Sequence, residues 1–375
     1  MSWPTESDLE SLDLIIDRMH PIPNFPYPMK TTRNEHFPSS KGDPWIGAYT
    51  KNGYWFKFSW GKRQHWDEII PEAAYRSGFL KDSKSFEVYR NVLKPSAELK
   101  FLIAKNIRED VLGILEMAQF EEFVVLGTIF VVEDFRHVGI GKMMMNEVMK
   151  TNKDKDVAMN SISYLIPSAH KNYNLIPQIC RKILRITLDS PQGFENLQNN
   201  LVGFTVKSKS TMSSEDFSNI SIYSESMNHS KINWSAYPQI VAIFDEKTDD
   251  CCGVAVIQEI QNDEDILPDL FLGPVYANSE EIVEVLMNNC LKKYYNPEDD
   301  YDFDIDHEAI YRRTLDFFIF SENFNTPFYT NIIAKLNPKE TKAKSQYFQT
   351  CSNFLLPSTT HTKIWALSDP NIFLT

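Results

Sequence analysis

The sequence has few cysteines, no excess of positive charge and no long apolar run. Its five cysteines lie far apart except for the neighbours Cys251 and Cys252, so they predict neither a disulfide framework nor a zinc site. A formal net charge of −13 at pH 7 argues against nonspecific binding to nucleic acid or to anionic membranes, both of which attract basic surfaces. No apolar run approaches the roughly 20 residues of a membrane helix, and the acidic N-terminal residues lack the apolar core of a signal peptide. We therefore expect a cytoplasmic protein with reduced thiols.

With 375 residues, the chain is long enough for two domains of ordinary size. Residues 6–19 have the apolar spacing of an amphipathic helix, and proline-rich residues 20–43 follow. Residues 210–235 are rich in serine and asparagine, which indicates a boundary. We expect a helix and a proline-rich arm over 1–44, a first domain over 45–209, a linker over 210–235 and a second domain over 236–375.

Apolar periodicity predicts the same order of elements in both halves, which indicates an internal duplication and an α/β fold with a mixed sheet. The first half is predicted to have helices at 66–77 and 85–93, strands at 99–106, 111–119 and 123–132, a helix from 140 and a strand at 157–166. After these elements, the spacing of Ile179, Ile183 and Ile186 suggests a helix, and a strand at 202–209 closes the first half. The second is predicted to have strands at 239–245, 253–260 and 270–276, a helix at 279–294, a strand at 315–320 and a helix at 329–336.

Residues 123–150 combine a strand, a glycine-containing turn and a helix, and the other elements are arranged around them. The strand is apolar and rich in β-branched residues, and Ile140, Met144 and Val148 recur with helical spacing. Residues 133–142 contain two closely spaced glycines where the helix begins. The free N–H groups and the positive dipole end of a helix attract an anion there, and glycine allows a phosphate to come close.

This turn does not match a dinucleotide-binding fingerprint, because its glycines lie two apart and a third is missing. An ordinary start of a helix would require neither the arginine nor both glycines. The acidic residues at 298–308 lack the glycine of a calcium loop and are better explained as a solvated loop. We predict no metal site.

Residues 131–141 resemble the acetyl-CoA-binding segment of the GNAT superfamily of N-acetyltransferases. Arg136, Gly139 and Gly141 match its signature, Phe135 matches the usual aromatic residue and Val131 the usual β-branched strand end. The resemblance implies two tandem GNAT-like folds and acetyl-CoA as a co-substrate. It implies that the backbone of Phe130, Val131 and Val132 pairs with the pantetheine arm, that Arg136 adds positive charge, and that the amides of His137, Val138, Gly139, Ile140, Gly141 and Lys142 hold the pyrophosphate.

The second half resembles a degenerate GNAT repeat. Its equivalent turn at 273–280 lacks the arginine signature and contains Pro274, which removes an N–H donor. Glu280 and Glu281 occupy the place where a phosphate would be attracted, so they would repel it. As a whole, the chain resembles a nematode family of tandem GNAT-like proteins in which only the first half keeps the cofactor motif.

The residues that many GNAT enzymes use for acid–base chemistry are missing. The usual glutamate position falls near Val125, and the usual tyrosine before a terminal Gly203-Phe204 pair is Asn199. The sequence therefore assigns no catalytic residue, and two hypotheses stay open: an acetyltransferase acting on an unidentified amine, or a pseudo-enzyme that binds acyl-CoA or a partner protein. Possible substitutes, each of which is more often a strand-face or turn residue, are Glu116, Glu121, Glu122, Tyr164 and Tyr173.

Overall fold

The computed structural model describes residues 46–49, 55–106, 108–162, 165–189, 191–226, 231–261, 268–295, 313–337, 344–354 and 363–367. The helix and arm predicted over 1–44 lie outside these residues. The first half consists of β1 (Ile46–Tyr49), β2 (Trp55–Trp60), α2 (Arg63–Ser77), α3 (Ser85–Leu93), β3 (Glu98–Lys105), β4 (Val111–Gln119), β5 (Phe123–Val131), η1 (Glu133–Phe135), α4 (Ile140–Thr151), β6 (Asp156–Ile162), α5 (Ile166–Tyr173) and β7 (Ile176–Asp189).

The second half repeats the order of three strands, a helix, a strand, a helix and a strand. It consists of η3 (Gln192–Asn196), β8 (Phe204–Ser208), η4 (Lys209–Thr211), α6 (Ser214–Glu225), η5 (Trp234–Ala236), β9 (Gln239–Asp245), β10 (Cys251–Ile260), β11 (Asp269–Ala277), α7 (Glu280–Tyr295), β12 (Thr314–Phe320), η6 (Ser321–Asn323), α9 (Pro327–Leu336), β13 (Lys344–Ser352) and β14 (Ile364–Ala366). Among the described residues, no helix has both the length and the apolar character needed to cross a membrane.

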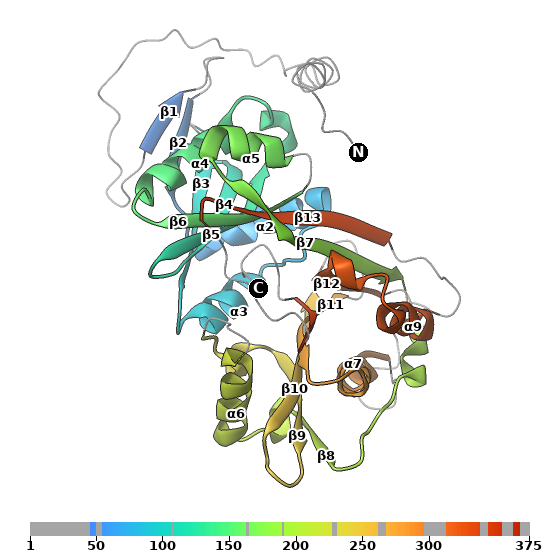
Figure 1. Ribbon diagram of the computed structural model, residues 1–375. Helices are drawn as coiled ribbons and strands as arrows, with labels where there is room; N and C mark the ends of the chain where they lie inside the picture. Colours follow the sequence, from blue (N-terminus) through green and yellow to red (C-terminus); the bar gives the residue numbers. More distant parts are fainter. Residues whose placement is uncertain are drawn as a thin grey trace.

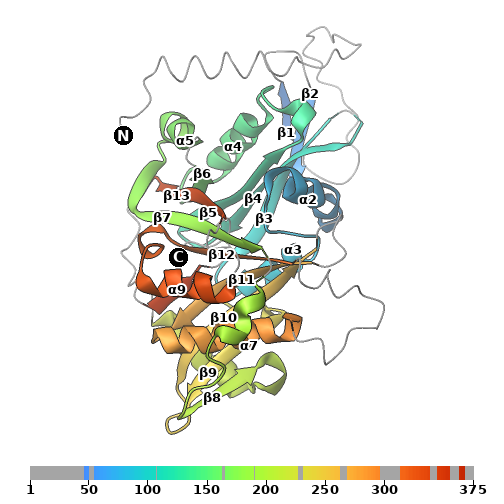
Figure 2. The same cartoon turned by 90° about the vertical axis from the view of Figure 1, so that its right-hand side faces the viewer.

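The strands of the described residues form one mixed sheet that runs through both halves (Figure 1). Its order is β1-β2-β3-β4-β5-β6-β13-β7-β12-β11-β10-β9-β8, with β14 attached to β11. In the first half, α2 and α3 cover one face and α4 and α5 the other (Figure 2). In the second half, α6 packs on one face and α7 and α9 on the other. The predicted mixed α/β fold is confirmed.

Two strands join the halves by reciprocal exchange: β7, near the middle of the chain, and β13, near its end. Strand β13, from the second half, lies between β6 and β7 and pairs antiparallel with both. Strand β7, from the first half, pairs in turn with β12 of the second half. Figures 1 and 2 both show β7 and β13 side by side between the halves. Each half therefore completes its sheet with a strand from the other.

The helix suggested by Ile179, Ile183 and Ile186 is a wrong prediction, because these residues lie in the strand β7. Ile183 packs in a core shared by both halves, whereas Ile186 packs in the core of the second half, on the opposite face. Side chains three residues apart point to opposite faces of a strand. A three-residue apolar spacing therefore also fits a strand that is covered on both faces.

The structure also changes the predicted end of one strand, the pairing of another and the predicted linker. The strand predicted over 157–166 ends at Ile162, and α5 begins at Ile166 with a proline in its first turn, where proline favours a helix start. The strand predicted at 202–209 exists as β8, but it pairs with β9 instead of closing the first half. The predicted linker over 210–235 contains α6 and the buried Trp234. The division into domains stays a prediction.

The strand exchange predicts that the first half does not fold alone. A fragment ending at residue 209 would lose β13, so the edges of β6 and β7 would lose their hydrogen-bond partners. We expect this fragment to be aggregated or unfolded by near-ultraviolet circular dichroism and gel filtration. Co-expression with residues 210–375 should restore a soluble complex, and a folded monomeric fragment would contradict the prediction.

Candidate cofactor-binding site

The site begins at a bulge in β5. Leu115 of β4 pairs with Ile129 of β5, and Met117 pairs with Leu126. One residue of β4, Glu116, therefore faces two residues of β5, Gly127 and Thr128. Such a bulge bends its strand and increases the local twist.

A buried polar cluster holds this bulge in place. Lys81 precedes α3, and its Nζ forms an ion pair with Glu116. The same Nζ donates to Thr128 Oγ1 (2.8 Å), and the Thr128 N–H donates to Glu116 Oε2 (3.4 Å). Lys81 and Glu116 are both fully buried. The rings of Trp66 and Tyr89 also lie 5.9 and 5.7 Å from the ammonium group. These contacts link three segments at the bulge.

Beyond the bulge, β5 and β6 separate. Their parallel pairing runs from Phe123 opposite Asp156 to Leu126 opposite Met159 and stops there. Strand β6 continues to Ile162 by pairing with β13 on its other side. Among the described residues, no strand pairs with residues 127–131 of β5 on the side that faces β6. The N–H and C=O groups along this edge can therefore pair with an extended ligand that carries amides.

The turn after β5 presents its backbone to the same region. His137 and Gly139 both have left-handed backbone conformations, with φ angles of 63° and 98°. Helix α4 follows at Ile140, and the buried side chains of Val138 and Ile140 fix the turn on the core. A Cβ atom at Gly139 would contact no atom within 4 Å, so glycine serves the backbone conformation there and not the packing. The helix N-terminus thus points its free N–H groups outward, next to the open edge of β5.

The three basic residues of the turn have different surroundings. Arg136 is half-buried; its Nε donates to the carbonyl of Val131 (3.0 Å), and its guanidinium lies 5.6 Å from the Phe130 ring. It therefore ties the turn to the end of β5. His137 and Lys142 are exposed. All predicted cofactor-binding residues, 130–132 and 136–142, thus lie within one continuous strand end, turn and first helical turn.

Tyr173 is a further functional candidate beside this turn. It ends α5, and its hydroxyl donates to the carbonyl of Lys142 (3.2 Å) in the first turn of α4. Burial raises the pKa of the Tyr173 phenol, so it stays protonated at neutral pH. From the sequence, Tyr173 is only one of several possible substitutes, because the GNAT resemblance places the tyrosine before Gly203-Phe204.

The expected Gly203-Phe204 pair lies away from the site. Phe204 begins β8 and pairs with Asp245 of β9 in the second half. The carbonyl of Asn199, at the expected tyrosine position, accepts a hydrogen bond from Asn289 of α7. The alignment of these residues with a terminal motif of the first half is therefore wrong. A Gly-Phe pair also suits the start of an ordinary strand, so the motif was too short to locate the acid.

The other described acid–base candidates either lie at the far end of β5 or are buried in the core. Glu121 and Glu122 are exposed at the start of β5, the opposite end from the glycine turn. Val125 is fully buried in the core, and Glu116 belongs to the buried cluster. Tyr164 lies outside the described residues. Among the described groups, no set of His, Cys, Asp and Glu side chains has the arrangement of a metal site, and the acidic residues at 298–308 are not described.

In the second half, the equivalent turn carries negative charge. Glu280 and Glu281 are exposed in the first turn of α7. A hydrogen bond with the Ser279 side chain lowers the pKa of Glu281, which keeps it ionised at neutral pH. Carboxylates at this helix end repel a phosphate.

No protein-family model and no curated protein sequence matches this chain. Solved structures with a similar fold include GNAT proteins and acetyltransferases. One is a tandem GNAT protein from the clavulanic acid biosynthesis pathway: identity is 10%, 80% of this chain and 100% of that chain are covered, and the TM-score is 0.56.

Two further solved structures have a comparable likeness. A putative acetyltransferase from Pyrococcus horikoshii has 11% identity and a TM-score of 0.52, with 90% of this chain and 97% of that chain covered. A GCN5-related N-acetyltransferase from Sphaerobacter thermophilus has 10% identity and a TM-score of 0.50, with 79% and 95% covered. The chain therefore has a tandem GNAT fold.

The buried cluster predicts a characteristic double-mutant cycle. Replacing Glu116 with Leu, or Lys81 with Met, leaves a buried charge without its counter-ion, which costs about 3–5 kcal/mol of unfolding free energy. The double variant Lys81→Met/Glu116→Leu should recover most of that loss in a urea denaturation series. The exposed pair Arg63–Asp67 is the control, because breaking it should cost less than about 1 kcal/mol. Additive losses in the buried double variant would contradict the ion-pair interpretation.

Proposed function

We propose that the first half is an acetyl-CoA-dependent N-acetyltransferase that transfers an acetyl group to an amine. The observation that supports this most is the continuity of the bulged, open edge of β5 with the glycine turn at α4. An extended ligand with amides along one part and a pyrophosphate at its end fits both features together. Coenzyme A has this chemistry, because its pantetheine arm carries two amides.

In this proposal, residues 130–132 hold the pantetheine arm by backbone pairing, and the amides of residues 137–142 hold the pyrophosphate. Lys142 supplies exposed positive charge in a protein whose net charge is −13, and the exposed His137 lies beside it. Arg136 supports the turn, because its Nε donates a hydrogen bond to the carbonyl of Val131. The first domain, residues 45–209, carries the activity, and the degenerate domain, residues 236–375, does not.

Acyl transfer requires the departing CoA thiolate to regain a proton. Tyr173 is the residue that we propose for this step, because its phenol is half-buried and protonated at neutral pH; its hydroxyl has to turn from the Lys142 carbonyl toward the thiolate. N–H groups near the bulge can polarise the thioester carbonyl. Glu116 is fully buried and paired with Lys81, so we assign it the support of the bulge and not the role of general base.

The alternative is a pseudo-enzyme that binds acyl-CoA or a partner protein without turnover. The observation in its favour is that Val125 stands where many GNAT enzymes have a glutamate, and it is buried in the core. Both hypotheses predict cofactor binding, and only the first predicts release of free thiol in the presence of an amine.

Calorimetric titration with acetyl-CoA tests the cofactor site. Gly139→Asp adds a carboxylate at the proposed phosphate position, so we expect affinity to fall by about tenfold or more. Gly203→Asp is a matched control, since Gly203 is also left-handed (φ 83°), also has no atom within 4 Å of its Cβ position, and precedes β8. The Gly203→Asp variant carries similar backbone strain and should bind acetyl-CoA normally. Absence of binding by the wild-type chain would rule out the cofactor assignment.

Tyr173→Phe tests the proton donor. With a panel of amines and detection of free CoA thiol, we expect kcat to fall by about 100-fold or more, while the Kd of acetyl-CoA stays unchanged. The donor must be protonated, so wild-type activity should decline as the pH rises through the raised pKa of this phenol, and the variant should lack that decline. Unchanged kcat would exclude Tyr173, and binding without any turnover would favour the pseudo-enzyme.

A further inference from the structure

The second half contains the same bulge as the first half, at the equivalent position. Ala255 of β10 pairs with Val275 of β11, and Ile257 pairs with Leu272. One residue of β10, Val256, therefore faces Gly273 and Pro274. The parallel pairing of β11 with β12 consists of Leu270 with Leu315 and Phe271 with Asp316 and stops before this bulge. The edge of β11 after the bulge corresponds to the edge of β5 that we assign to the cofactor arm.

In the second half, the chain itself occupies this edge. Strand β14 pairs antiparallel with β11, joining Val275 to Ala366 and Tyr276 to Ile364. The N–H of Leu367 donates to the carbonyl of Phe318 on β12 (2.7 Å). Residues 363–367 thus connect the two strands that separate at the bulge, and we call them the plug segment.

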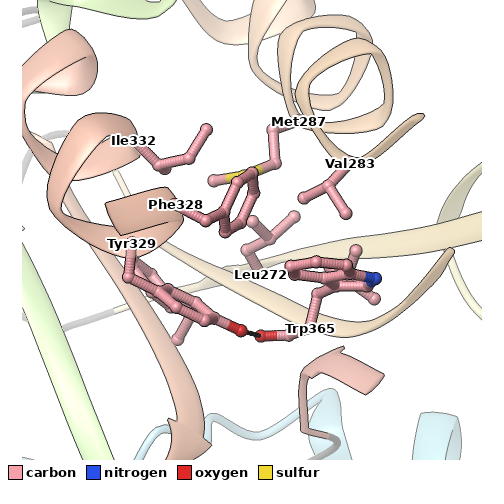
Figure 3. A pocket seen from close by; sticks show the side chains of 9 residues that line it. Leu272, Val283, Met287, Phe328, Tyr329, Ile332 and Trp365 are labelled. Carbon is pink, nitrogen blue, oxygen red and sulfur yellow. Dashed lines mark hydrogen bonds between the residues drawn. The ribbon is translucent and has the colours of Figure 1, made fainter. Parts of the chain in front are cut away.

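Side chains of the plug segment are integral to the packing. Ile364 and Leu367 are 2% and 0% exposed. Trp365 Nε1 donates to the carbonyl of Ala277 (3.0 Å), and the Tyr329 hydroxyl donates to the carbonyl of Trp365. The Trp365 ring lies 4.6 Å from that of Phe328. Figure 3 shows Trp365 in the wall of a small apolar pocket, with Met287 and Val283 of α7 on one side and Phe328 and Tyr329 of α9 on another.

Gly273, in the bulge of β11, leaves room for the backbone of the plug segment. A Cβ atom at Gly273 would lie 2.2 Å from the carbonyl oxygen of Leu367, a distance that no real contact tolerates. At the bulge of the first half, Lys81 contacts Thr128 and Glu116, whereas Val256, the counterpart of Glu116, is apolar. The second bulge therefore accommodates the close approach of a peptide backbone.

Charge at the end of the groove also opposes a phosphate-bearing ligand. Glu280 and the ionised Glu281 lie at the start of α7, where the first half has Lys142 at the start of α4. We propose that the groove between β11 and β12 is a peptide-binding groove whose resident occupant is the plug segment, and that it takes an extended, uncharged amide chain and no acyl-CoA. The occupancy follows from the pairing of β14, and only the comparison with a cofactor arm rests on the proposed function.

A chain that ends at residue 362 tests this proposal by rescue in trans. Without the plug segment, the separated edges of β11 and β12 lose their hydrogen bonds and their apolar cover, so we expect the melting temperature to fall by about 5 °C or more. A synthetic peptide of residues 360–370 should restore it and bind with one-to-one stoichiometry. The same peptide with Trp365→Ala and Leu367→Ala is the control and should not rescue. An unchanged melting temperature, or equal rescue by both peptides, would overturn the proposal.

Hydrogen exchange of the full wild-type chain provides a measurement that needs no variant to fold. We expect the Leu367 and Ile364 amides to exchange at least about 100-fold more slowly than an unstructured peptide, because they belong to a paired edge. Exchange at the unstructured rate would contradict a resident plug.

Titration with CoA separates this proposal from the proposed function. We expect one CoA per chain, both for the wild type and for the shortened chain with its peptide. A second CoA bound by the shortened chain would overturn the peptide groove and leave the first site intact. If the peptide rescues but no CoA binds at all, the cofactor assignment fails and the plug stands.

Discussion

Lys81 and Glu116 meet in the interior of the first half, and the geometry of the candidate site depends on where they hold β5. A buried ion pair is expensive to desolvate, so its value lies in fixing an arrangement rather than in adding stability. Here it fixes a bulge: Glu116 accepts from the amide of Thr128, and Lys81 donates to the hydroxyl of Thr128. The extra residue turns β5 away from β6 at Leu126, and the separated edge leads directly into the glycine turn. The cofactor residues proposed at 130–132 and 136–142 all lie beyond this one irregularity.

The two halves show how one scaffold gives opposite outcomes at equivalent positions. Both have a bulge in the same register, and both have a parallel strand pair that separates there. In the first half, the helix start after the bulge carries Lys142; in the second, it carries Glu280. Leu367 then completes the second groove from within the chain. A backbone amide edge needs hydrogen-bond partners, and in our proposal the charge at the helix N-terminus selects between a phosphate-bearing ligand and the plug segment.

Strand exchange gives the second half a structural role although it has no proposed cofactor site. Strand β13 stands beside β6, whose other edge borders the proposed cofactor groove. Thr350 of β13 forms a buried hydrogen bond with Asn160 of β6, and Asn353 accepts from the amide of Val157 (2.7 Å). Arg185 of β7 pairs in return with Asp316 of β12 (2.8 Å). The second half thus positions one wall of the groove.

The sequence by itself determined the turn, the order of elements and the mixed sheet, because these depend on local properties. Gly139 and Gly141 allow the backbone of a helix start to approach a ligand, and apolar periodicity reports burial within one element. The spacing of Ile183 and Ile186 predicts a helix where the structure has β7, because the two side chains pack on opposite faces, which a single sequence cannot distinguish from helical spacing. Only the tertiary structure could bring Lys81 to Glu116, Tyr173 to Lys142 and Leu367 to Phe318. These contacts join residues 31 to 49 positions apart, and their formation depends on the register and the bulges of strands that pair across the whole chain.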